Sequence, residues 1–224
     1  MHCRPRQLRA VHYNARAAER IATLLQAARA AGIPLQLCSD STLTAMVGPV
    51  RHQGVVATAA PFPYAALDDI IAATPSLLIL ADRMQDPHNA GALLRTAEAV
   101  GAGDVILPKD GSVPVTSAVE AAAAGAAALL PVCRVINAER TLRSVKEHGY
   151  WVWGLVPQAG VDLFNSDPPR PLLVVVGGEA GMRPLVARRC DTLVSIPMFG
   201  RVESLNASVA AAIAMYHVRH QWGA

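Results

Sequence analysis

The sequence predicts an α/β fold with a mostly parallel sheet and helices on both of its faces. Short, uninterrupted apolar runs such as Leu77–Leu80 and Leu172–Val176 are typical of central strands that are buried on both faces. Between such runs lie segments with apolar residues at helical spacing, as the crossover helices of a parallel sheet require. The chain has 224 residues, 52% of them hydrophobic, which is enough to bury a sizeable core.

The first part of the chain predicts a small α/β unit of its own. Its predicted elements are a strand at 8–12, a helix at 16–31, a strand at 33–37, a helix at 40–46 and a strand at 54–57. We expect Gly32 to end the first helix and Asp40 with Ser41 to cap the second. Because Pro61 and Pro63 then mark a joint, we expect a small domain over residues 1–60 and a larger one over 75–224.

The second part alternates strands and helices more strictly, which predicts the main parallel sheet. We expect its strands at 77–80, 104–107, 132–136, 151–155, 172–176 and 192–196. We expect its helices at 91–100, 117–128, 139–148, near 184–189 and after residue 206. Ligands of such sheets bind beyond the carboxyl ends of the strands, and the polar loops of this sequence fall there.

Composition and charge exclude several classes of protein. No segment approaches the roughly 18 uncharged apolar residues of a membrane helix, and the basic start of the chain lacks the apolar core of a secretory signal. We therefore expect a soluble, cytoplasmic protein without a membrane partner. The four cysteines are scattered, without a CxxC pair or histidines at zinc-like spacing, so we expect neither disulfides nor a bound metal.

The charge of the chain is uneven along its length. The formal net charge is +3, yet residues 1–51 hold seven arginines against only two carboxylates. A basic first part favours contact with a polyanion such as nucleic acid. Arginine is, however, the usual cation of the whole chain, so the charge alone leaves a purely compositional origin open.

The first polar loop leads from the strand at 77–80 into the helix at 91–100. Its sequence with the start of that helix is DRMQDPHNAGALLR, residues 82–95. Backbone N–H groups at the start of a helix point beyond the sheet, where they can meet a ligand. Arg95 lies one turn into the helix, and its spacing predicts that it lies on the same side of the helix as Asn89 and Gly91. On its own, the pattern fits a capping loop with a surface arginine equally well.

The second polar loop is GGEAGM, residues 177–182, directly after the strand at 172–176. Its glycines allow a ligand to approach the backbone closely. The loop is not the GxGxxG fingerprint, and no acidic residue ends a following strand, which disfavours a Rossmann-type oxidoreductase. Glu179 could be a simple anion partner at a helix N-terminus, or it could hold a catalytic arginine.

The third polar segment is IPMFGRVESLNASVAAAI, residues 196–213. Asn206 is a good N-cap for the helix that follows. Capping by Asn206 leaves Ser204 and Ser208 unexplained, so the three polar groups together favour a pocket.

Taken in order, DxxxDPxNxGxxxR, GGEAGM and IPMxGxxxSLNxSVA resemble the three motifs of the SpoU (TrmH-like) branch of the SPOUT RNA methyltransferases. The resemblance spans about residues 76–217. Residues 8–57, with RHQGVVA at 51–57, resemble the N-terminal substrate-binding domain of the subgroup that methylates a guanosine ribose in 23S rRNA. The resemblance implies a deep C-terminal trefoil knot, a homodimer formed through the knot, and methyl transfer from S-adenosylmethionine to a ribose 2′-hydroxyl of RNA.

The resemblance also implies which residues act. The catalytic set matches Asn89, Arg95, Glu179, Ser204 and Asn206. The positions that hold S-adenosylmethionine match Gly177, Ile196, Met198 and Leu205. A guanidinium with a pKa above about 12 hardly releases its proton. We therefore expect Arg95 to act as a fixed cation near the reacting hydroxyl rather than as a base.

The sequence departs from the family pattern in three places. GGEAGM is one residue shorter than the usual motif, the helix that follows Pro108-Lys109-Asp110 is rich in alanine rather than basic, and the chain starts where the family's second strand would be. Two alternatives therefore stay open, a tRNA ribose 2′-O-methyltransferase and a knotted RNA-binding protein without turnover.

Overall fold

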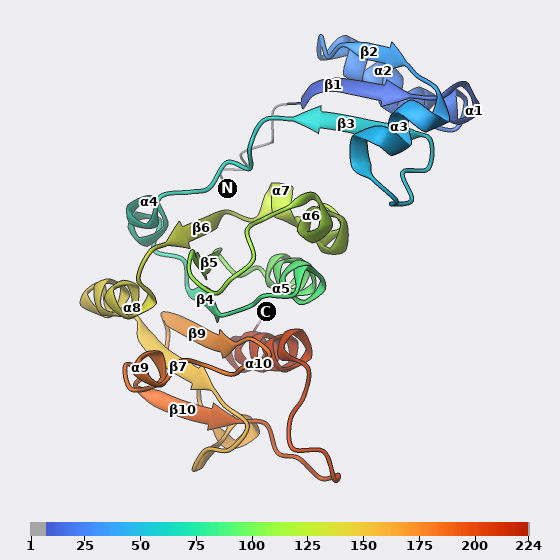
Figure 1. Cartoon of the computed structure of the whole chain (residues 1–224). Coiled ribbons are helices and arrows are strands. Elements are labelled where there is room, and N and C mark those ends of the chain that lie inside the picture. The colour runs from blue at the N-terminus through green and yellow to red at the C-terminus, as the bar shows by residue number, and fades with distance from the viewer. Residues whose placement is uncertain (1–7, 224) are drawn as a thin grey trace. The chain divides into compact units, whose positions relative to one another are not determined.

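The computed structural model describes residues 8–223, which divide into two compact units (Figure 1). The smaller unit ends at Pro63 and the larger one starts at Tyr64. This boundary lies at the second of the two prolines that predict a joint in the sequence.

The smaller unit is a three-stranded sheet with helices. Its elements are β1 (Leu8–Tyr13), α1 (Ala15–Ala18), α2 (Ala22–Ala30), β2 (Leu35–Leu37), α3 (Asp40–Val47) and β3 (Val55–Ala59). The strand order is β2-β1-β3, with β2 parallel and β3 antiparallel to β1. Its small core gathers around Val11, Leu25 and Ala28.

Two details of this unit differ from the sequence prediction. The single helix predicted over 16–31 is broken into α1 and α2, and Arg20 in the break donates to the Gln53 side-chain oxygen at 3.1 Å and to its backbone carbonyl. The cap of α3 is Ser39 rather than the predicted Asp40 and Ser41, because the Ser39 hydroxyl accepts from the backbone N–H of Thr42 at 3.1 Å.

The larger unit confirms the predicted α/β class. Its strands are β4 (Leu77–Asp82), β5 (Asp104–Pro108), β6 (Val132–Val135), β7 (Trp151–Leu155), β8 (Val161–Asp162), β9 (Leu172–Gly177) and β10 (Thr192–Ser195). They form one sheet in the order β6-β5-β4-β9-β7-β10-β8, and every neighbouring pair in it is parallel. Every strand therefore ends at the same edge of the sheet, as a shared site requires.

The helices of the larger unit lie on both faces of this sheet. They are α4 (Leu67–Ala72), α5 (Pro87–Ala99), α6 (Ser117–Ala123), α7 (Ala126–Leu129), α8 (Ala138–Glu147), the 3₁₀ turn η1 (Leu163–Asn165), α9 (Pro184–Ala187) and α10 (Ala207–Trp222). Helices α4, α8 and α9 cover one face, and α5, α6 and α10 cover the other (Figure 1). None of the helices within residues 8–223 has both the length and the apolar composition to cross a membrane.

Two helices of this unit also differ from the prediction. The helix predicted from 91 starts at Pro87, because the Asp86 carboxylate caps it and a proline is well suited to the first helical position. The helix predicted over 117–128 is interrupted, since Ala124 and Gly125 both adopt positive φ values, 49° and 95°, and end α6 before α7 starts.

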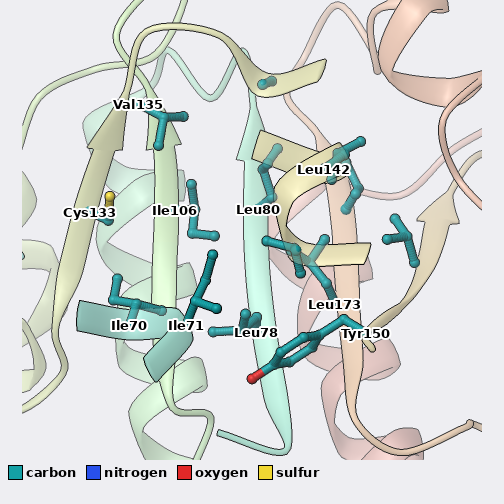
Figure 2. Close-up of a cluster of buried hydrophobic side chains, with 14 of the residues drawn as sticks. Ile70, Ile71, Leu78, Leu80, Ile106, Cys133, Val135, Leu142, Tyr150 and Leu173 are labelled. Carbon is teal, nitrogen blue, oxygen red and sulfur yellow. The ribbon is translucent and has the colours of Figure 1, made fainter. Parts of the chain in front are cut away.

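A hydrophobic core lies between the sheet and the helices α4 and α8 (Figure 2). Leu78 and Leu80 of β4, Ile106 of β5 and Leu173 of β9 project onto this face, and each is fully buried. Side chains alternate along a strand, so Leu77 and Ile79 point to the other face, where they are buried as well. Burial on both faces explains the uninterrupted apolar run of this strand.

Candidate active site

A cavity of about 420 Å³ lies at the carboxyl-terminal edge of the larger sheet. Three segments that are distant in the sequence form most of its wall, namely the residues after β7, the GGEAGM loop after β9 and the segment between β10 and α10. Its volume falls within the range of small-molecule sites. Of the residues that the sequence singles out, eight line it: Asn89, Gly177, Glu179, Ile196, Met198, Ser204, Leu205 and Asn206.

Asn89, in the first turn of α5, joins the three motifs in the wall of this cavity. Its side-chain NH₂ group donates to Glu179 Oε1 at 2.5 Å, and its side-chain oxygen accepts from the Asn206 amide at 2.9 Å. A carboxylate can only accept, so the contact with Glu179 fixes which way the Asn89 amide is turned. Asn89 is buried, with 7% of its surface exposed. The network therefore holds three loops in one arrangement.

Asn206 has two tasks in the structure. Its side-chain oxygen accepts from the backbone N–H groups of Ser208 and Val209, at 2.9 and 3.3 Å, and so caps α10 as the sequence predicts. Its NH₂ group is then free to reach Asn89. The Ser208 hydroxyl donates to the same Asn206 oxygen at 2.7 Å, so Ser208 supports the cap, whereas Ser204 is exposed and lines the cavity.

The two glycines that begin the GGEAGM loop are required by close backbone contacts. A Cβ atom on Gly178 would lie 2.0 Å from the carbonyl oxygen of Arg83, and one on Gly177 would lie 2.4 Å from the backbone nitrogen of Met182. No side chain fits at either position without moving the backbone. The loop is one residue shorter than the usual family motif, and Glu179 nevertheless reaches both the cavity and Asn89.

The segment at 197–205 is unusual in its hydrogen bonding. None of its backbone or side-chain groups makes a hydrogen bond within residues 8–223. Two of its members, Met198 and Leu205, are half-buried and line the cavity. Because residues 199–204 are exposed, these groups are left to bond to water or to a molecule in the cavity.

Arg95 does not join the site within a single chain. It is exposed on α5, it does not line the cavity, and its guanidinium makes no hydrogen bond or ion pair with the part of the chain from 8 to 223. The reason is the helical repeat. Arg95 follows Gly91 by four residues, so both lie on the same face of α5. This face packs against α6 at Gly91, where an added Cβ atom would lie only 2.4 Å from Ala122 Cβ. Asn89 lies on another face, the one toward the cavity.

Several residues that line the cavity belong to none of the three sequence motifs. Leu155 is the last residue of β7, and Val156 and Pro157 follow it. The position of Leu155–Pro157 at the carboxyl end of a predicted parallel strand is a signal that points to them. They are apolar or backbone contributors, so residue type gives no further hint.

The part of the chain that the structure describes gives no support for nucleophilic catalysis by a cysteine or for a bound metal ion. Cys190 lies near the cavity, with its thiol 4.0 Å from the sulfur of Met182, but burial and the neighbouring Asp191 and Asp82 raise its pKa to about 12. It is therefore a neutral thiol and not a nucleophile. Within the range 8–223, no three His, Cys, Asp or Glu side chains are grouped so that they could bind a metal ion.

Comparison with known proteins places the chain among RNA methyltransferases. Residues 76–216 match the SpoU rRNA methylase family, which is more than half of the chain. The chain belongs to this family. Residues 4–65 also match the domain described as RNA 2′-O ribose methyltransferase substrate binding.

Relatives of this family member align over most of its length. It is 44% identical to the 23S rRNA (guanosine-2′-O-)-methyltransferase RlmB of Ralstonia nicotianae, over 90% of this chain and 83% of that protein. It is 42% identical to RlmB of Shewanella oneidensis, over 91% and 85%. Among solved structures, the SpoU methyltransferase AviRb from Streptomyces viridochromogenes, in complex with AdoMet, superimposes with a TM-score of 0.82 at 26% identity, covering 97% of this chain and 84% of that one.

Proposed function

We propose that this SpoU family member transfers a methyl group from S-adenosylmethionine (AdoMet) to the ribose 2′-hydroxyl of a guanosine in 23S rRNA. The observation that carries the proposal is the Asn89 network, which joins the three family motifs in the wall of one cavity. Relatives that align over four fifths or more of both chains are named for this reaction. An enzyme that methylates ribosomal RNA acts where ribosomes are assembled, and this supports a cytoplasmic location for the protein.

The lining of the cavity suits AdoMet. Leu155, Ile196 and Leu205 offer apolar walls for a flat adenine ring. The backbone groups of segment 197–205, which have no partner within residues 8–223, can bond the polar edges of the nucleoside. Gly177, Ile196, Met198 and Leu205 would hold the cofactor, largely through such groups.

When bound, AdoMet supplies an electrophilic methyl group on a sulfonium. The task left to the protein is to align the ribose hydroxyl with that methyl group, and alignment alone can contribute on the order of 7–11 kcal/mol to lowering the barrier. Asn89 and Asn206 offer the ribose polar groups that hydrogen bonds hold in place in the cavity wall, Ser204 adds a hydroxyl there, and Glu179 keeps the Asn89 amide in place. A nearby guanidinium would stabilise negative charge on the attacking oxygen.

Arg95 reaches such a position only with a second copy of the chain. We propose that the chain forms a homodimer through a C-terminal trefoil knot and that each Arg95 serves the cavity of the other protomer. Support comes from the exposed, unpaired guanidinium of Arg95 within the described residues and from apolar side chains beside the cavity. Phe199 is 96% exposed, Val202 is 66% exposed and Val209 is 47% exposed. Surfaces of this kind favour association.

The smaller unit would bind the RNA. Exposed arginines on it supply the positive charge that phosphates attract, namely Arg9, Arg16, Arg20, Arg29 and Arg51. We propose a division of labour between an RNA-binding domain over residues 1–60 and a catalytic domain over 75–224.

The proposal is tested by incubating the full chain with AdoMet labelled in its methyl group and with total RNA, followed by nuclease mapping. Label in 2′-O-methylguanosine of 23S rRNA is the expected result. Label in tRNA would contradict the substrate, and AdoMet binding without label in any RNA would indicate a binding protein instead of an enzyme.

Arg95→Ala tests the assignment of roles within the site. It is expected to bind AdoMet as the wild type does and to lose turnover by about 10²–10³-fold, the usual loss for one electrostatic donor. If AdoMet binding fell as far as turnover, Arg95 would not have the role assigned to it.

A further inference from the structure

An ion pair between a buried carboxylate and a partly exposed arginine lies beside the cavity without lining it. Asp82, the last residue of β4, has no exposed surface, and its carboxylate is bound by Arg183. The backbone N–H of Arg183 donates to Asp82 Oδ2 at 2.8 Å, its Nε donates to Oδ1 at 2.8 Å, and its Nη2 donates to Oδ1 as well. Because desolvation offsets much of the attraction in such pairs, a contribution to stability alone is a weak explanation for this one.

Asp82 also binds the other end of the same loop. Its backbone carbonyl accepts from the N–H of Gly178 at 2.8 Å. The loop from 178 to 183 therefore starts and ends on one residue, and the N–H of Gly181 closes it by donating to the Gly178 carbonyl at 2.9 Å. The position of Asp82 thus sets the shape of the whole loop.

This loop forms one wall of the cavity. Gly178, Glu179, Gly181 and Met182 line it, and Glu179 is the residue that accepts from Asn89. A change at Arg183 is therefore passed to the wall and to the carboxylate of Glu179. The remaining ion pair of Arg183, with the 90% exposed Asp110 at 3.7 Å, is open to water and contributes little.

We propose that Asp82 and Arg183 are positioning residues of this site. The pair holds the loop at 178–183 in the conformation that accepts the methyl donor and that presents Glu179 to Asn89. Neither side chain lines the cavity, so both act through the loop. The inference rests on the proposed function, because it takes the cavity to be the AdoMet site.

The test compares AdoMet affinity in variants of the full chain, measured by calorimetry. Arg183→Ala is expected to weaken AdoMet binding tenfold or more, and Arg183→Lys, which keeps the charge and the backbone contact, is expected to lie between it and the wild type. Arg189→Ala is the matched control. Arg189 binds the Glu139 carboxylate through Nε and Nη2, at 2.8 and 2.5 Å, and does not line the cavity, so its loss is expected to leave the affinity unchanged.

A second variant separates positioning from stability. Arg183→Ala leaves the buried Asp82 carboxylate with the backbone N–H of residue 183 but without its charged partner, which lowers stability. The double variant Asp82→Leu with Arg183→Met removes both charges, and we expect its melting temperature to recover while the AdoMet affinity stays at least tenfold weaker.

Three results would overturn the inference. The first is an AdoMet affinity that recovers together with the melting temperature in the double variant, and the second is an unchanged affinity in Arg183→Ala. The third is a wild-type chain that does not bind AdoMet at all. Only the third result also contradicts the proposed function, so failure of the positioning role can be told apart from failure of the proposed function.

Discussion

The Asp104 carboxyl is expected to make the stability of the larger unit depend on pH. Asp104 starts β5 and is only 4% exposed, and its carboxyl makes no hydrogen bond or ion pair within the described range 8–223. Burial raises its pKa from 3.8 to about 7. Its titratable neighbours Cys133 and Tyr150, with pKa values raised to about 11 and about 12, stay neutral below pH 9.

The sign and the size of the effect follow from this shift in pKa. Below pH 4 the carboxyl is protonated in the folded and in the unfolded chain. Between pH 4 and 7 the unfolded chain releases the proton and the folded chain keeps it, so the free energy of unfolding falls as the pH rises, and above pH 7 it levels off. A difference of about three pKa units corresponds to about 4 kcal/mol in total, of which about 3 kcal/mol is lost between pH 5 and 8.5.

Asp104→Asn removes this titration. The variant is expected to be more stable than the wild type, with an advantage that grows by about 3 kcal/mol from pH 5 to pH 8.5. Urea unfolding followed by tryptophan fluorescence measures it, because all three tryptophans, at 151, 153 and 222, lie in the same unit as Asp104. Asp167→Asn, at an exposed carboxyl, is the control. An advantage that is equal at the two pH values would refute the reasoning.

Two further substitutions test the packing and the network of the site. Gly91→Ala is expected to lower the free energy of unfolding by about 1–3 kcal/mol, although alanine has the better helix propensity. The reason is steric, because a Cβ atom at position 91 would lie 2.4 Å from the Cβ of Ala122 and 2.7 Å from the Val119 carbonyl oxygen. Gly160→Ala is the control, since a Cβ atom there would meet open space, and it should leave the free energy of unfolding unchanged in the same urea titration. Asn206→Asp keeps the oxygen that caps α10 and loses the donor to Asn89, so its unfolding free energy should stay within about 1 kcal/mol of the wild type while methyl transfer slows. Full activity in this variant would contradict a role for the Asn206–Asn89 contact.

Sequence patterns predict most of the fold, because the pattern of apolar residues in each element follows from which of its faces are buried. The apolar runs of β4 and β9 are fully buried on both faces, and a run of that kind has few other interpretations. Elements that depend on few residues are missed, such as the short helix α4 and the two-residue strand β8. The order of the strands cannot be read from the sequence either, since nothing local indicates that β9 lies between β4 and β7.

The sequence predicts which loops form the site better than it predicts which contacts join them. Parallel strands end at one edge, so the meeting of the three polar loops follows from the topology. The partner of Glu179 cannot be predicted in this way, because the sequence leaves open a helix N-terminus or an arginine and the structure gives Asn89. Spacing places Arg95 beside both Asn89 and Gly91, yet these two residues lie on different faces of α5, one toward the cavity and one against α6.

The central place of β9 has a consequence during synthesis on the ribosome. The strands β4, β5 and β6 can pair with one another as soon as they emerge, but β7 has only β9 and β10 as neighbours, and both are made later. At about 5–20 residues per second, roughly one to four seconds pass between the completion of β7 and that of β9. For that interval the nascent chain presents Trp151–Leu155 as an apolar segment that has no strand partner and only the earlier helix α8 to pack against, which leaves its hydrogen-bonding edges open to other chains.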